Sequence, residues 1–77
     1  MSTGLDVFDK TLETTNNWLK DVMDELGLED RHRTYETLKA VLHTLRDRLN
    51  PEEAADLGAQ FPLLIRGMYY EGWNPAR

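Results

Sequence analysis

Two histidines, His32 and His43, are the side chains in this sequence best suited to chemistry. Each is followed one helical turn later by a carboxylate, Glu36 after His32 and Asp47 after His43. Imidazole and carboxylate groups at this spacing share one face of a helix and can ligate a divalent metal ion. The alternative is a solvated polar face whose i, i+4 pairs support the helix modestly. Short motifs of this kind recur by chance, so the polar face is favoured and a metal or small-ligand site is the second hypothesis.

Other catalytic arrangements are missing from the sequence. It contains no cysteine, which excludes thiol catalysis, iron–sulfur clusters, cysteine zinc sites and disulfides. It also lacks a glycine-rich phosphate loop and an HExxH motif, and no threonine is accompanied by a recognisable histidine-and-acid arrangement. We therefore expect a protein that is not an enzyme, with no catalytic residues and no cofactor.

The charge balance argues against a nucleic-acid partner. The 77 residues include 9 basic and 14 acidic side chains, a net charge of −5, whereas phosphate binding calls for the opposite sign. No apolar run approaches the roughly 20 residues that span a bilayer, and the N-terminus MSTGLDVFDK lacks the basic start of a signal peptide. We expect a cytoplasmic protein with no membrane segment. The basic residues scatter around a helical wheel: Arg31, Arg33, Lys39, Arg46 and Arg48.

The chain is organised around an amphipathic helix predicted over residues 30–49. Asp30 is a good N-cap, and Asn50-Pro51 ends the helix because a residue before proline avoids the α region. Apolar side chains recur there at steps of three and four, which keeps them on one face. The predicted stripe consists of Tyr35, Leu38, Leu42, Leu45 and Leu49.

A first helix is predicted over residues 6–26, with Gly27 at the position of a left-handed C-terminal residue. The short link Leu28-Glu29 predicts that this helix lies beside the next one, antiparallel to it. Its apolar positions again step by three and four, as in a heptad pattern. They are Phe8, Leu12, Thr15, Leu19, Val22 and Leu26.

Two shorter helices complete the predicted fold. Asn50 and Pro51 provide the N-cap and first turn of the third helix, on which the small residues Ala54 and Gly58 allow close approach of a neighbour. The fourth, LLIRGMYYE, follows Pro62. The sequence thus predicts one all-α domain over residues 1–77: a four-helix bundle of two long antiparallel helices plus two short ones. We expect a flexible leader over residues 1–5 and a loose tail over 74–77.

The fourth helix is apolar nearly all round and therefore needs cover on every side. A chain of 77 residues has little material to provide it. The aromatic side chains of the fourth helix and the residues just after it can complete the core, form a protein–protein contact or line a ligand pocket. We expect the contact, by self-association through this helix. The candidate interface residues are Leu64, Ile65, Met68, Tyr69, Tyr70 and Trp73.

The runs EDRHRTYETLKAVLHTLRDRL and PEEAADLGAQFPLLIRGMYYEGW resemble a bacterial family catalogued as domain of unknown function 2267 (DUF2267). The resemblance extends from about Phe8 to Trp73 and implies an all-helical cytoplasmic protein with no assigned activity. Members usually contain two related helical halves in tandem, and this chain resembles the first half alone. We therefore expect a non-enzymatic interaction or scaffold module whose partner is a second copy, with a dimer favoured, or a second helical half.

Overall fold

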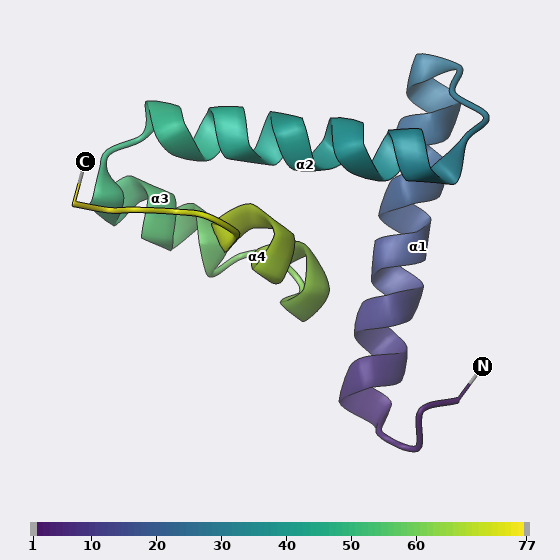
Figure 1. Cartoon of the computed structure of the whole chain (residues 1–77). Coiled ribbons are helices and arrows are strands. Elements are labelled where there is room, and N and C mark those ends of the chain that lie inside the picture. Colours follow the sequence, from purple (N-terminus) through teal and green to yellow (C-terminus); the bar gives the residue numbers. More distant parts are fainter. Residues whose placement is uncertain (1, 77) are drawn as a thin grey trace.

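Four α-helices form the secondary structure of residues 2–76, the part of the chain that the computed structural model describes. They are α1 (Asp6–Leu26), α2 (Arg31–Arg48), α3 (Pro51–Gly58) and α4 (Leu63–Tyr70), arranged as in Figure 1. The α4 helix packs against each of the other three, and α1 packs against α2. The predicted all-α, four-helix fold is confirmed. Residues 1 and 77, at the ends of the expected leader and tail, lie outside the described residues.

The helix boundaries follow local chemistry that the sequence displays. Gly27 adopts the left-handed conformation (φ 66°, ψ 27°) that glycine tolerates best, and its amide donates to the carbonyl of Met23. The carboxylate of Asp30 accepts hydrogen bonds from the first amides of α2, at 2.9 and 3.4 Å. Asn50 and Glu53 form a reciprocal capping box at the start of α3. The predicted starts of α2 and α3 and the predicted end of α1 are therefore confirmed.

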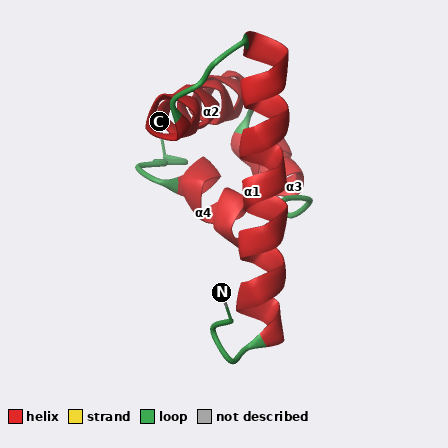
Figure 2. Cartoon of the chain, turned by 90° about the vertical axis from the view of Figure 1, so that its right-hand side faces the viewer, coloured by secondary structure: helices red, strands yellow, loops and turns green. Residues whose placement is uncertain are grey.

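The two long helices cross steeply instead of lying side by side along their lengths. Figure 1 shows α2 running away from the upper part of α1, and Figure 2, viewed along α2, shows the N-terminal turns of α1 extending beyond the other helices. The chain turns sharply because Gly27 is left-handed while Asp30 is extended (φ −98°, ψ 117°). This arrangement differs from the antiparallel pair expected from the short link, and it leaves the first turns of α1 without contact to α2.

The core lies where α4 meets α1 and α2. Ile65 and Tyr69 of α4 are completely buried, and Met68 is nearly so. Leu19 of α1 joins them, together with two leucines of α2. The short α4 helix is thus the element on which the other helices converge.

Close approach of α3 and α4 depends on small residues, as predicted. Tyr69 donates its hydroxyl hydrogen to the carbonyl of Ala54, at 2.7 Å. A Cβ added at Gly58 would lie 2.6 Å from Cζ of Tyr70, so only glycine leaves room for that ring. Ala54 is itself fully buried.

The buried face of α2 differs from the predicted stripe. Leu38 and Leu42 are buried as expected, but Leu45 is 42% exposed and Arg46 takes the buried position at that turn. The reason is that the C-terminus of α4 lies against this part of α2 and presents carbonyl groups, which require a donor rather than a leucine. The full buried set is Thr34, Leu38, Leu42 and Arg46.

Candidate functional site

The two histidines do not form a common site. His32 is exposed and pairs with Glu36, at 2.8 Å between Nε2 and Oε1. His43 lies three turns further along α2, about 16 Å away at 1.5 Å per residue, with Nε2 2.7 Å from the carbonyl oxygen of Met68. Asp47, the expected companion of His43, accepts hydrogen bonds from Arg46 instead. Within residues 2–76, no group of three or more His, Asp or Glu side chains is placed to hold a metal ion.

Three polar side chains of α2 contact the C-terminal part of α4 and the residue that follows it: Lys39, His43 and Arg46. Arg46, only 6% exposed, donates from Nη1 to the carbonyls of Tyr69 (3.0 Å) and Glu71 (2.8 Å). Lys39 lies 3.8 Å from the Glu71 carboxylate, and interactions with Tyr35 and then Glu71 raise the pKa of Lys39 above its ordinary 10.5. Cations are favoured at a helix C-terminus by the helix dipole. These side chains therefore hold the fold together, and they explain the stripe that suggested a metal or ligand site.

The aromatic side chains form a continuous series of ring contacts within the chain. Trp18 meets Phe61 edge to face at 5.8 Å, and Phe61 meets Tyr69 at 5.0 Å. The series continues through Tyr70 to Trp73, both half-buried. Among the predicted interface residues, the fourth helix contributes three side chains to the chain's own core: Ile65, Met68 and Tyr69. Of the six predicted interface residues, Leu64 is the most exposed, at 40%.

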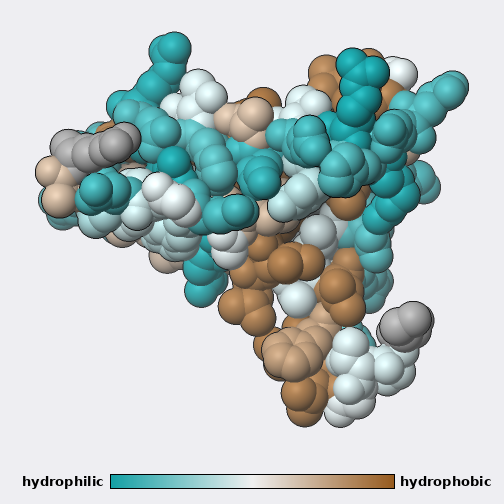
Figure 3. All heavy atoms as spheres, in the orientation of Figure 1, coloured by the Kyte–Doolittle hydropathy of each residue, from teal (hydrophilic) through white to brown (hydrophobic). Residues whose placement is uncertain are grey.

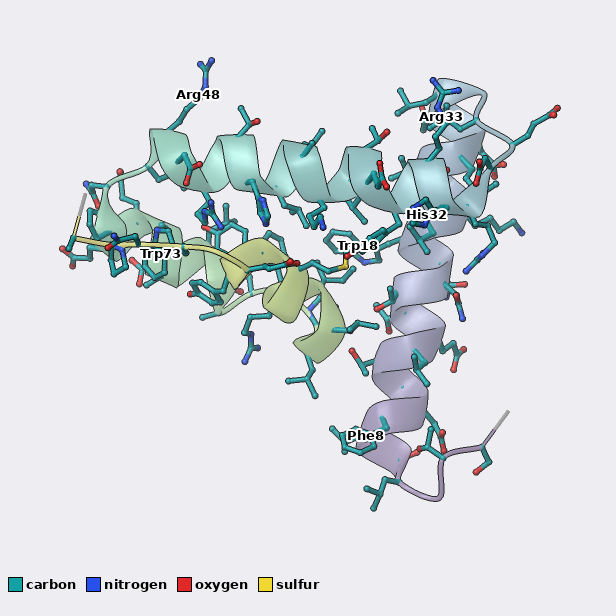
Figure 4. The ribbon with its side chains drawn as sticks, in the orientation of Figure 1. Phe8, Trp18, His32, Arg33, Arg48 and Trp73 are labelled. Carbon is teal, nitrogen blue, oxygen red and sulfur yellow. The ribbon has the colours of Figure 1, made fainter. Side chains whose placement is uncertain are left out.

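Apolar side chains are exposed at a different place, the inner corner between α1 and α4. We call this the corner surface; each of its residues is between 40% and 58% exposed. Figure 3 shows hydrophobic atoms gathered there, and in Figure 4 Phe8 projects from α1 on the side that faces α4. The corner surface consists of Leu5, Val7, Phe8, Leu12, Leu63 and Leu64.

A single hydrogen bond joins the two sides of the corner surface: the amide of Leu64 donates to Oγ1 of Thr11, at 2.9 Å. On one side of this contact lies a groove of about 630 Å³, which we call the corner groove. Leu12, Leu19 and Met68 are among its apolar residues, and Arg31, His32 and Glu71 are among its polar ones. The groove is open to solvent and mostly apolar, which suits a docked side-chain stripe better than a catalytic reaction.

The chain exposes more surface than a compact protein of its mass. Its accessible area is 5648 Å², whereas a compact 9.0 kDa monomer exposes about 4,850 Å². Its radius of gyration is 13.5 Å, against about 11.5 Å for a compact chain of this length. The difference of about 800 Å² equals the area that one partner contributes to an interface of standard size.

The sequence analysis did not identify most residues of the corner surface, although the different lengths of the helices pointed to them. A 21-residue helix is about 31 Å long, and the two eight-residue helices are about 12 Å each, so they cannot cover all of it. The predicted stripe of α1 therefore remains uncovered at its N-terminal end. We call residues 5–14, which carry that exposed half of the stripe, the arm.

The described residues thus define an all-α domain with an exposed apolar corner. No helix in that part of the chain is both long and apolar enough to cross a membrane. Residues 15–77 match the family model described as "Uncharacterized conserved protein (DUF2267)". The chain belongs to this family, which confirms the resemblance noted in its sequence. A comparison with curated proteins found no match.

Proposed function

We propose that the protein is a non-enzymatic helical interaction module that self-associates through the corner surface. The C-terminal apolar helix contributes only its first turn, Leu63 and Leu64, because the rest of its apolar surface lies in the core of its own chain. The proposed interface therefore lies mainly on α1, whereas the sequence analysis expected it on the fourth helix. The proposal also places the protein in the cytoplasm, which a cysteine-free composition supports.

The observation that carries the proposal is the uncovered arm. Phe8 and Leu12 lie on the same stripe as the buried Leu19, yet they remain 44% and 41% exposed. The arm is the N-terminal end of the 21-residue helix α1, and most helical stability in proteins comes from packing an apolar face. Covering its partly exposed phenylalanine and leucine with a partner surface therefore stabilises the arm.

Substitution of Phe8 by aspartate tests the proposal. Fully burying an exposed phenylalanine contributes about 1.5–3 kcal/mol, and Phe8 has 44% of its surface left to bury. Two symmetric copies therefore contribute about 1.3–2.6 kcal/mol, and Phe8→Asp weakens association by about tenfold or more. Sedimentation equilibrium measures the dissociation constant. The matched control is Val41→Asp, because Val41 is also exposed (58%) but lies on α2, away from the corner. Equal association of both variants with the parent protein contradicts the proposal.

A further inference from the structure

Resting on that self-association, we propose that the corner groove receives the arm of a second copy, laid antiparallel to α1, with Asp9 of each copy facing Arg31 of the other. The groove is lined by α1, and Arg31 lines it beside Asn16, two helical turns beyond Asp9. A second arm laid antiparallel along α1 therefore brings its own N-terminal turns toward Arg31. A two-fold axis across the two helices repeats the same contact, as in an isologous dimer.

Arg31 is a cation held in place without a counter-ion. Its Nη2 donates to Oδ1 of Asn16 at 2.6 Å, which holds the guanidinium against α1 beside the groove that both residues line. In the described part of the chain no carboxylate lies within ion-pair distance of it. A guanidinium oriented by a neutral amide has donors left for a carboxylate, the group whose planar geometry it matches best.

The arm offers a carboxylate on the matching edge. Asp9 precedes Asn16 by seven residues, two helical turns, so both lie on the same edge of the apolar stripe. The amide and the hydroxyl of Thr3 both donate to Oδ1 of Asp9, at 2.8 Å each. These bonds lower the pKa of Asp9 below its ordinary value and orient the carboxylate.

The antiparallel direction follows from symmetry and charge together. A two-fold axis perpendicular to α1 keeps the Asp9 edge of one copy on the same side as the Asn16 edge of the other, and it reverses their direction. Asp9 of each arm then lies opposite Arg31 of the other copy, so the dimer contains two Asp9–Arg31 ion pairs. The arm carries three acidic residues against one lysine, which complements the positive charge of Arg31: Asp6, Asp9, Glu13 and Lys10.

Mixing two charge-reversed variants tests this arrangement. Asp9→Arg alone and Arg31→Glu alone each place like charges opposite one another at both contacts, so each weakens self-association by about tenfold or more. An equimolar mixture recovers association, because every contact between the two variants again joins opposite charges. Arg33→Glu makes the same charge change on a side chain that projects away from the groove, and it leaves association unchanged (Figure 4).

The outcomes separate this inference from the proposed function. If Phe8→Asp abolishes association while Asp9→Arg and Arg31→Glu still associate like the parent, the arm is buried but not in this orientation, and the inference is wrong. Failure of the mixture to recover association also contradicts it. A parent chain that stays monomeric overturns both proposals and leaves the groove for a different protein. Circular dichroism of each variant shows whether its helices are intact.

Discussion

Removal of the Arg46 guanidinium has a large expected effect on stability. In Arg46→Met the length and apolar stem of the side chain are kept, while the carbonyls of Tyr69 and Glu71 lose their shared donor. A hydrogen bond to a charged group contributes about 1.5–3 kcal/mol, and a buried acceptor left alone costs a similar amount. Because the Glu71 carbonyl is only partly buried and regains water, we expect a loss of about 3 kcal/mol.

Urea unfolding followed by circular dichroism measures this loss. All variants are compared at one protein concentration, since association makes apparent stability concentration-dependent. Arg48→Met is the matched control: Arg48 lies on the same helix but projects into solvent, so its replacement changes stability by less than about 0.5 kcal/mol (Figure 4). A loss below about 1 kcal/mol in Arg46→Met, or equal losses in both variants, refutes the capping role.

Three further predictions concern the core. Gly58→Ala destabilises the fold by about 1–2 kcal/mol, because the added Cβ displaces the ring of Tyr70. Gly67→Ala stabilises α4 by about 0.5–1 kcal/mol, because the Cβ added there meets nothing within 4 Å. Urea unfolding that ranks the two variants in the reverse order contradicts the described contact between Gly58 and Tyr70. Thr15→Val raises stability by about 1 kcal/mol, because the buried Oγ1 of Thr15 has no hydrogen-bond partner in the described chain, and a lower melting temperature in the variant contradicts this. Burial raises the pKa of Tyr69 above its ordinary 10.0, so its contribution to stability is complete below pH 10 and is lost as pH rises through the folded-state pKa. The free energy of unfolding in urea therefore falls less steeply above pH 10 in Tyr69→Phe than in the parent, and an equal pH dependence contradicts the prediction.

Local chemistry was enough to predict the helices. Gly27, Asp30 and Asn50 mark the end of α1 and the starts of α2 and α3 in sequence and structure alike, because capping depends on residues only a few positions away. The crossing of α1 and α2 was not predictable in this way. It depends on the backbone angles of the link and on the position of α4, which are properties of the whole fold.

The candidate site was predicted only in part, for a related reason. Hydropathy indicated that the chain has more apolar surface than it can bury, and we expected the exposed part on α4. Ile65 and Tyr69 of α4 are instead the most buried side chains of the core. Exposed apolar side chains lie on α1 instead, where Phe8 is 44% exposed. Periodicity tells which residues share a face, but not how far along that face a neighbour extends. Likewise it could not show that Arg46 caps another helix.

Self-association through the corner surface is the central claim, and the mass of the protein in solution tests it most directly. Light scattering over a dilution series reports that mass without any substitution. The account predicts twice the 9.0 kDa of the chain, falling toward the monomer only at high dilution. A mass of one chain at every concentration contradicts it, because the arm would then be stable with its apolar stripe in water.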